Sequence, residues 1–434
     1  MELLPDSQEH RLNRLLEQSW PILDHLKNEN SESLFGWVGE HIAEVVREGC
    51  ETWGLSAEEE LPMGVTFSFP MKQTSLSEAT LMAMGKGFAI TSDLDLGGHL
   101  LKGYEQHRTS DLPPIKITAI TNDAVATLVS FVYQYPATPN QKAAMGLIVG
   151  TGCNATIPLK LSSLHQNKFP DQISVQQDQD LSDVGIAVNT EWSINGSAAP
   201  LRNLGLISRW DEELDKAGEA PGFQPLEYMT AGRYLGELAR LILVDYLTTV
   251  HGVSPEHLPQ RLHQRFGLST TFLSHFYPDS HKGDILEQLQ KEFDLTTTTE
   301  TETTFTWTSD HADALYQIAK AIQTRAAGIV AAATIGLLRC ADEIPDPSET
   351  IVEEDGIVDG DAVVEELVVG YTGGCIQHFQ DYLKDTQAFL DFIMQEEFAA
   401  SQGKQIRVTL EPCHDGGITG AGILVPAALA STKA

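Results

Sequence analysis

The residues best placed to do chemistry stand where two predicted strands end. The segment MGVTFSFP alternates large apolar residues with smaller ones up to Phe69, and Pro70 closes this predicted strand beside Ser68. The segment KITAIT predicts a second strand, which ends in Asn122 and Asp123 before the small-residue helix AVATLV. An Asp between a strand and a helix is well placed to meet a ligand, but it can also cap the helix, and capping is the commoner role. Asp123 alone therefore does not identify a site.

Length and charge narrow the class of protein. The chain has 434 residues, of which 42% are hydrophobic, and this is enough for two lobes with substantial cores. Its formal net charge of −33 argues against a nucleic-acid partner, because phosphate binding needs a basic face. An anionic substrate such as ATP would need backbone N–H groups and a metal ion near its phosphates. Eleven Asp or Glu residues without any Lys or Arg fall within 341–366, which predicts a solvated acidic loop.

Cysteine usage and hydropathy bear on the compartment. Five Cys residues are scattered without a CxxC pair, and the odd count argues against a disulfide framework and indicates a reducing compartment. The N-terminal segment MELLPDSQEHRLNRLLEQ is polar and charged, so no signal peptide is predicted. The longest apolar helical run, Ala326–Leu338, is too short to span a bilayer. These features predict a cytoplasmic protein without a membrane partner.

Hydrophobic periodicity predicts an alternation of helices and strands. One amphipathic helix has an apolar face that includes Leu34, Val38 and Ile42. Glycine turns follow two predicted strands, and a Gly-rich loop over 415–422 precedes a final small-residue helix. Helices are predicted over 9–18, 75–84, 227–250 and 311–339, and strands over 63–69, 115–121, 145–149, 185–189, 367–369 and 407–410.

Six segments then occur in a characteristic order. They are LPMGVTFSFPMKQTSL, KGF, NDAVATL, GLIVGTGCNA, VNTEW and LEYMTAGRYLGELARLIL. This series resembles the hexokinase family, especially fungal hexokinases and glucokinases, from about residue 19 to about residue 430. The resemblance implies an α/β fold of the actin-like, ribonuclease H-like ATPase class, with two lobes around a cleft. It implies a small lobe over 1–123, a large lobe over 124–420 that contains the acidic loop 341–366, and a terminal helix over 421–434 that returns to the small lobe.

The resemblance also implies a sugar site, built from side chains that hydrogen-bond hydroxyl groups in fixed directions. Taken singly, each residue could be a surface charge or a polar group satisfied by the backbone, but together, in matching motifs, they favour a hexose site. Asp123 matches the family's catalytic Asp, which takes the hydroxyl proton during phosphoryl transfer. Gly85 replaces the Thr of the family's TKGF motif, which removes a hydroxyl contact and weakens binding by ~1 kcal/mol. The implied sugar-binding residues are Ser68, Lys86, Asn122, Asp123, Asn154, Glu191 and Glu227.

A nucleotide site is implied at glycine turns, which offer backbone N–H groups to phosphates. The sequence departs from the family where VGYTGG stands for VGVDGS and DGG for DGSG, so Thr372, Gly374 and Gly417 replace Asp, Ser and Ser. The family's first phosphate motif, LDLGGTNxR, has no match upstream of Trp20. A missing first exon, a degenerate chain, or a partner that supplies the strand edge would each account for this. The implied nucleotide-binding residues are Gly150, Thr151, Gly152, Gly373, Asp415, Gly416 and Gly417, and no residue is assigned to a metal.

These expectations give one main hypothesis and two alternatives. The main hypothesis is transfer of the γ-phosphoryl group of ATP, with Mg²⁺, to the 6-hydroxyl of glucose or a related hexose, the first step of glycolysis. Sugar binding would close the cleft and exclude water. The first alternative is a catalytically impaired, hexokinase-like sugar-binding regulator, which the altered nucleotide motifs favour. The second is a structural or interaction protein with neither activity.

Overall fold

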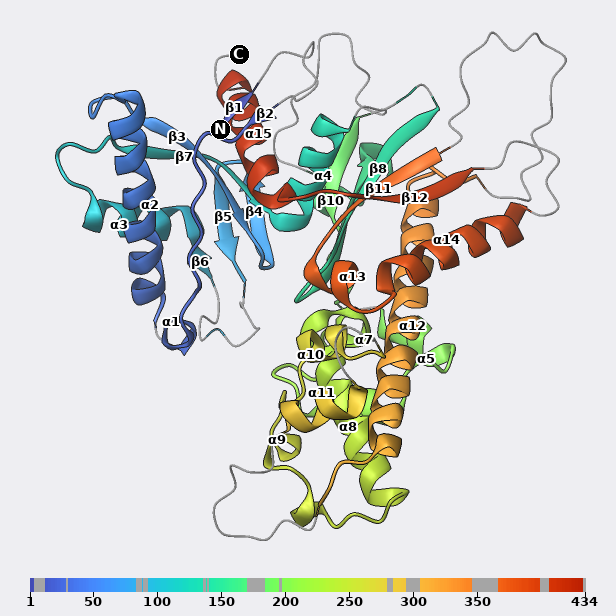
Figure 1. Ribbon diagram of the computed structural model, residues 1–434. Helices are drawn as coiled ribbons and strands as arrows, with labels where there is room; N and C mark the ends of the chain where they lie inside the picture. The colour runs from blue at the N-terminus through green and yellow to red at the C-terminus, as the bar shows by residue number, and fades with distance from the viewer. Residues whose placement is uncertain are drawn as a thin grey trace, which may run out of the picture. The chain divides into compact units, whose positions relative to one another are not determined.

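The computed structural model divides the chain into two compact units, each of which mixes helices and strands (Figure 1). Unit 1 comprises Met1–Ala137, Thr156–Asn189 and Cys413–Ala434, and unit 2 comprises Thr138–Ala155 and Thr190–Pro412. The predicted α/β class is confirmed. The division into lobes predicted over 1–123, 124–420 and 421–434 stays a prediction. The residues that the structure describes are 1–3, 12–28, 30–82, 88, 93–135, 138, 140–169, 184–194, 197–278, 284–293, 305–345, 366–398 and 406–431.

Unit 1 draws elements from both ends of the chain. Strand β9 (Cys153–Lys160) begins in unit 2 and ends in unit 1, where it pairs antiparallel with β10. The strands of unit 1 are β1 (Glu2–Leu3), β2 (Leu12–Asn13), β3 (Leu61–Phe67), β4 (Met71–Ser75), β5 (Glu78–Leu81), β6 (Leu94–Asp95), β7 (Ile115–Asn122) and β10 (Gly185–Asn189). Its helices are α1 (Asp24–Asn28), α2 (Ser31–Trp53), α3 (Leu96–His107), α4 (Asp123–Gln134), η1 (Leu161–Ser163), η2 (Gln166–Lys168) and α15 (Gly416–Ser431).

Strands β3 and β7 form the parallel pair that positions the candidate site in unit 1. Their register ends with Phe67 opposite Asn122. Because the strands are parallel, both end at the same edge, where Ser68 follows β3 and Asp123 follows β7. Strands β4, β5 and β6 form a separate antiparallel sheet.

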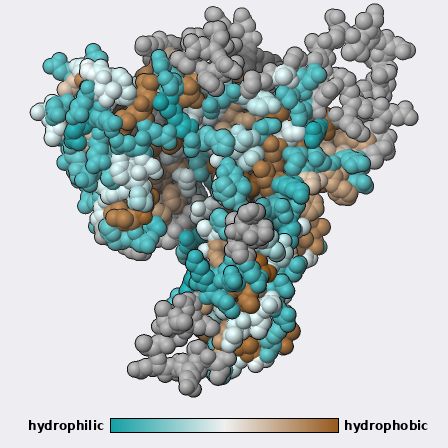
Figure 2. All heavy atoms as spheres, in the orientation of Figure 1, coloured by the Kyte–Doolittle hydropathy of each residue, from teal (hydrophilic) through white to brown (hydrophobic). Residues whose placement is uncertain are grey.

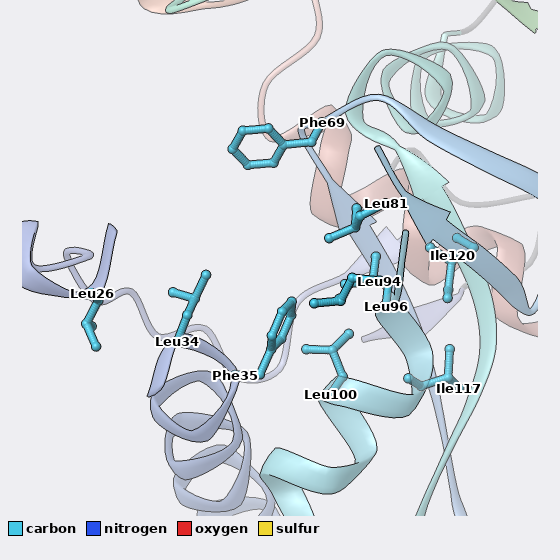
Figure 3. Close-up of a cluster of buried hydrophobic side chains, with 11 residues drawn as sticks. Leu26, Leu34, Phe35, Phe69, Leu81, Leu94, Leu96, Leu100, Ile117 and Ile120 are labelled. Carbon is cyan, nitrogen blue, oxygen red and sulfur yellow. The ribbon is translucent and has the colours of Figure 1, made fainter. Parts of the chain in front are cut away.

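The hydrophobic core of unit 1 gathers side chains of α2, α3 and the strands beside them (Figure 3). Helix α2 begins after Asn30, whose side chain accepts the N–H of Ser33 at 2.9 Å. Helices α2 and α3 approach closely, since a Cβ on Gly39 would lie 2.1 Å from the backbone carbon of Gly103. The buried side chains labelled in Figure 3 are Leu26, Leu34, Phe35, Phe69, Leu81, Leu94, Leu96, Leu100, Ile117 and Ile120.

Helix α15 brings the C-terminal segment onto unit 1, where it packs against α4, β3 and β7. A Cβ on Gly420 would lie 1.9 Å from the carbonyl oxygen of Ala126 on α4. A Cβ on Gly64 of β3 would lie 2.2 Å from the carbonyl oxygen of Ala421. The absence of side chains at these two glycines therefore lets the backbones meet.

Unit 2 contains three parallel strands of a mixed sheet and most of the described helices. Its strands are β8 (Gln141–Val149), the first residues of β9, β11 (Glu366–Thr372) and β12 (Arg407–Pro412). Its helices are α5 (Ala198–Asn203), α6 (Arg209–Lys216), α7 (Pro225–Thr230), α8 (Gly232–Thr249), η4 (Pro255–His257), α9 (Gln260–His263), α10 (Thr270–His275), α11 (Ile285–Glu292), α12 (Ser309–Cys340), α13 (Gly374–His378) and α14 (Tyr382–Phe398).

Strand β11 lies between β8 and β12, and all three run parallel. Thr372 at the end of β11 stands opposite Ile148, and Tyr371 stands opposite Pro412 at the end of β12. The interior of β11, including Val368 and Val369, is fully buried, as expected for a strand covered on both faces. The carboxyl ends of these strands therefore lie at one edge of the sheet.

Helix α12 packs against α8 and α14 within unit 2. Among the described helices it is the one whose length and composition would allow it to cross a membrane, with a mean hydropathy of 1.4 over its most apolar 18-residue window. More than half of that window, 56%, is buried inside the protein. The core helix of a globular protein has the same properties, so α12 is weak support for a membrane span.

The described surface is largely hydrophilic on the face that Figure 2 shows, with smaller apolar areas between. Among the large apolar side chains that the structure describes, Leu204 and Val250 are the most exposed. Each follows the end of a different helix. Single exposed apolar side chains are normal on a protein surface and need no functional explanation.

Two helices predicted from the sequence are wrong. In the predicted helix 9–18, Leu12 and Asn13 instead pair with Leu3 and Glu2 as β2 and β1, and 14–18 are not helical. In the predicted helix 75–84, residues 71–81 form the β4–β5 hairpin. In β5, Glu78 is exposed whereas Leu81 is fully buried, and pairing with β4 overrode the weak helical pattern.

Two further predictions needed correction at their boundaries. The helix predicted over 227–250 is broken at Ala231, which has the extended angles φ −96° and ψ 146°. The break lets α8 begin at Gly232, whose N–H donates to the carbonyl oxygen of Gly150 at 2.8 Å. The Gly-rich loop predicted over 415–422 is helical from Gly416, because close packing on α4 and β3 favours small residues there.

Candidate active site

Three predicted sugar-binding residues meet at the carboxyl edge of β3 and β7 in unit 1. Asn122 is buried, and its Oδ1 accepts the N–H of Ala124 at 2.9 Å, so Asn122 is the N-cap of α4. Asp123 is half-buried at the first helical position, and its Oδ1 accepts the same N–H at 3.0 Å. Ser68 is exposed just after the end of β3. Asp123 is the acidic residue in the first turn of α4, near the positive end of the helix dipole.

The other predicted sugar-binding residues that the structure describes gather at the start of β9 in unit 2. The backbone N–H of Cys153 donates to Glu227 Oε2 at 3.2 Å. The side-chain amide of Asn154 donates to Glu191 Oε1 at 3.3 Å, while its Oδ1 accepts the N–H of Ala155 at 2.8 Å. Two carboxylates and one amide thus converge on three consecutive residues of one strand, a donor and acceptor set that suits sugar hydroxyls.

Backbone strain and burial distinguish these two carboxylates from surface acids. Glu191 has φ +43°, a conformation that non-glycine residues seldom adopt and that recurs at functional sites. Glu227 is only 4% exposed at the start of α7. Burial raises the pKa of the neighbouring Cys153 thiol to about 12, and the Glu227 carboxylate adds to the shift. This thiol therefore stays protonated at neutral pH and is no candidate nucleophile.

Two predicted phosphate turns lie in contact at the carboxyl edge of the sheet in unit 2. Gly150–Gly152 follows β8, and Gly373 follows β11 with φ +120°. A Cβ on Gly373 would lie 2.3 Å from the carbonyl oxygen of Val149 and 2.7 Å from the backbone nitrogen of Gly150. Only glycine fits this approach, which leaves a side-chain-free cradle of the kind that phosphates occupy.

The start of α8 orients the turn between β8 and β9. The N–H of Gly232 donates to the carbonyl oxygen of Gly150 at 2.8 Å, and the N–H of Arg233 donates to that of Thr151 at 3.2 Å. Both carbonyl oxygens therefore face α8. The Thr151 side chain is exposed and, by its type, can donate a hydroxyl to a phosphate oxygen. These features fit the predicted role of Gly150, Thr151 and Gly152.

The last predicted phosphate residues, Asp415, Gly416 and Gly417, stand at the start of α15 in unit 1. Asp415 has φ +51°, and its carbonyl oxygen accepts the N–H of Thr419 at 3.1 Å in the first turn of α15. Its carboxylate accepts a hydrogen bond from Arg14 at 2.8 Å. Arg14 was missed by the sequence analysis, and no sequence signal points to it, because it lies 401 positions away from Asp415 in a polar segment.

The structure thus brings the predicted residues together within each unit. Lys86 lies outside the described residues. Within the described parts of the chain, no group of three or more His, Cys, Asp or Glu side chains could hold a metal ion. The roles assigned to individual residues from the sequence stay predictions.

A separate hollow in unit 2, with a volume of about 600 Å³, lies along α12 and contains none of the predicted site residues. Its cations are already paired. Arg325 binds Asp211, and Lys320 binds Asp381 and Asp385. The lining residues are Leu206, Gln317, Lys320, Ala321, Thr324, Arg325, Gly328, Ile329, Ala332 and Phe389.

Two family models, both described as hexokinase, match nearly the whole chain. One covers residues 2–133 and the other covers residues 144–427. Hexokinase-1 of Nicotiana tabacum is 26% identical over 403 residues, which span 91% of this chain and 70% of the relative. Hexokinase-7 of Oryza sativa subsp. japonica is 25% identical over 428 residues, which span 97% of this chain and 80% of the relative.

A solved structure shows the same fold. The hexokinase from Schistosoma mansoni complexed with glucose superposes with a TM-score of 0.70 at 23% identity, over 95% of this chain and 79% of that one. This likeness confirms the fold class predicted from the sequence.

Proposed function

Because this chain belongs to the hexokinase family, we propose that it is a hexose kinase that transfers the γ-phosphoryl group of ATP to the 6-hydroxyl of glucose or a related hexose. The observation that carries the proposal is the position of Asp123. It follows a parallel strand, begins a helix, and has Asn122 and Ser68 beside it at the same sheet edge. A half-buried carboxylate in that position suits a proton acceptor for a sugar hydroxyl.

The proposed role of Asp123 is general base. As the 6-hydroxyl oxygen forms its bond to the γ-phosphorus, the bond from that phosphorus to the bridging oxygen of ADP breaks, and Asp123 takes the hydroxyl proton. Asn122 and Ser68 would hold the sugar hydroxyls in register with this carboxylate.

In unit 2, Asn154, Glu191 and Glu227 are the proposed partners of the remaining sugar hydroxyls. The proposed phosphate contacts are backbone N–H groups of the Gly150–Gly152 turn and of Gly373. Mg²⁺, which binds ATP through its phosphates and needs few protein ligands, would neutralise phosphate charge. Such help is needed in a chain whose net charge is −33.

Cysteine chemistry supports the cytoplasm as the proposed location. Cys50, Cys153, Cys340, Cys375 and Cys413 are all free thiols in the structure. Free buried thiols are typical of a reducing compartment, where disulfides do not persist.

The test is ADP formation by the purified chain with ATP, Mg²⁺ and glucose, compared with an Asp123→Ala variant. The expected loss is about 10²- to 10⁴-fold in kcat, with glucose affinity changed far less, because the base acts mainly in the transition state. Asp111→Ala removes an exposed carboxylate of the same unit and should keep full activity.

Equal turnover by wild type and Asp123→Ala would refute Asp123 as the base. Absence of glucose-dependent turnover by the wild type would refute the kinase proposal. If saturable glucose binding then persisted, the sugar-binding regulator would replace it.

A further inference from the structure

Arg14 ties the N-terminal segment to the start of α15. Its Nη1 donates to Asp415 Oδ2 at 2.8 Å and to Glu17 Oε2 at 3.0 Å, and its Nη2 donates to Thr419 Oγ1 at 3.2 Å. The bond to Asp415 raises the pKa of the Arg14 guanidinium above its ordinary value. One side chain therefore holds both Asp415 and the first turn of α15.

Further contacts keep the segment around Arg14 on unit 1. The side-chain amide of Gln18 donates to Glu48 on α2. The Trp20 ring stacks on His41 of α2 with centroids 4.4 Å apart. These contacts restrain the segment that carries Arg14, so Arg14 loses less conformational freedom when it pairs with Asp415.

The charge of Asp415 matters for an anionic substrate. Asp415 is one of the nucleotide-binding residues that the family resemblance implies, and a bare carboxylate there would repel ATP. The carboxylate could also rotate and accept hydrogen bonds from the first N–H groups of α15, and these groups would then be unavailable to a phosphate. Arg14 opposes both effects, because its charge, which it shares between Asp415 and Glu17, offsets that of the carboxylate, and because its shorter hydrogen bond draws Oδ2 towards itself.

We propose that Arg14 is a positioning residue for ATP, which acts by neutralising and holding Asp415 at the start of α15. The inference rests on the proposed kinase function, since it assigns Arg14 to the nucleotide side of that reaction. Arg14 does not need to touch ATP for this role.

The experiment compares Arg14→Ala with the wild type in the full chain. ATP affinity is measured with glucose present, by competition with a fluorescent ATP analogue, and KM values for ATP and glucose are measured beside it. The expected result is a rise of about fivefold in the ATP dissociation constant and KM, with the glucose KM and kcat within about twofold. Arg14→Lys should recover most of the loss, because it restores the charge.

Two readouts separate charge neutralisation from a merely structural role. In an Asp415→Asn background, Arg14→Ala should have no further effect, because the carboxylate it compensates is gone. Salt of about 0.5 M should reduce the fivefold difference to less than about twofold, because exposed charges are screened. The matched control is Arg209→Ala, which breaks an exposed pair with Asp245 in unit 2 and should leave ATP affinity unchanged.

The outcomes are distinct for the two proposals. Unchanged ATP affinity in Arg14→Ala, a loss that persists in the Asp415→Asn background, or no ATP binding by the wild type would each overturn the role of Arg14. If the wild type binds ATP but shows no turnover, and Arg14→Ala weakens that binding, the role of Arg14 is supported and the kinase function is refuted.

Discussion

Replacing Gly420 with alanine should push α15 away from α4. The Cβ of the new side chain would lie 1.9 Å from the carbonyl oxygen of Ala126 and 2.7 Å from its Cα. Ordinary contacts begin at 3.4 Å, so the two backbones must separate by about 1.5 Å at this point. No flexible side chain is present to absorb the displacement, because the obstacle is backbone.

The magnitude follows from two opposing terms. In a helix interior, alanine stabilises the folded state by up to about 1 kcal/mol relative to glycine. Overpacking costs about 1 to 3 kcal/mol, and a clash with backbone lies at the upper end, where the contacts around the gap weaken as well. The net loss in the free energy of unfolding should therefore be about 2 kcal/mol.

The control is Gly336→Ala on α12, where a Cβ would meet nothing within 4 Å. The free energy of unfolding of this variant should rise by about 0.8 kcal/mol, because only the helix propensity changes. Urea denaturation followed by tryptophan fluorescence compares the two variants with the wild type, and hydrogen exchange of α4 and α15 peptides localises the change. If Gly420→Ala were as stabilising as Gly336→Ala, the close approach of α15 to α4 would be refuted.

Two other predictions concern buried charge. Arg240→Ala should lower the free energy of unfolding by about 3 to 5 kcal/mol in urea denaturation, because Glu237, which is 3% exposed, loses bonds of 2.8 and 2.6 Å from the guanidinium; a loss below about 1 kcal/mol, as expected for an exposed pair, would contradict this. Burial, and then the nearby His251, lower the pKa of His311. The neutral His311 should therefore contribute to the free energy of unfolding above the unfolded pKa of about 6.5, and this contribution should be lost as the pH falls through the lower folded pKa. The difference in unfolding free energy between wild type and His311→Phe, measured from about pH 8 to about pH 5, should show this slope, and parallel curves would exclude it.

The sequence predicted the features that depend on local pattern. Alternating apolar residues predicted β3, and the β-rich run KITAIT predicted β7. Asp123 follows β7 as predicted, whereas β3 ends at Phe67, so Ser68 lies just after the strand and not within it. The Ala-rich helix predicted over 311–339 is α12. The family was predicted because whole motifs, in order, carry more information than any single residue.

Local pattern misled where tertiary contacts outweighed it. Helical spacing runs continuously through Ala231, yet the chain bends there, because the N–H of Gly232 bonds to the turn at Gly150. Glycines at 416 and 417 predicted a loop, but packing on α4 and β3 stabilises a helix. In both places a contact with a distant segment decided between two locally permitted conformations.

What the sequence determined by itself is the set of strand ends, the buried faces and the motifs that name the family. Only the tertiary structure decided which side chains meet there. Asn154 reaches Glu191, and Arg14 reaches Asp415 across 401 positions of sequence. Periodicity and propensity act over a few residues, whereas these contacts depend on how β9 pairs antiparallel with β10 and on how α15 packs on unit 1, which no local pattern encodes.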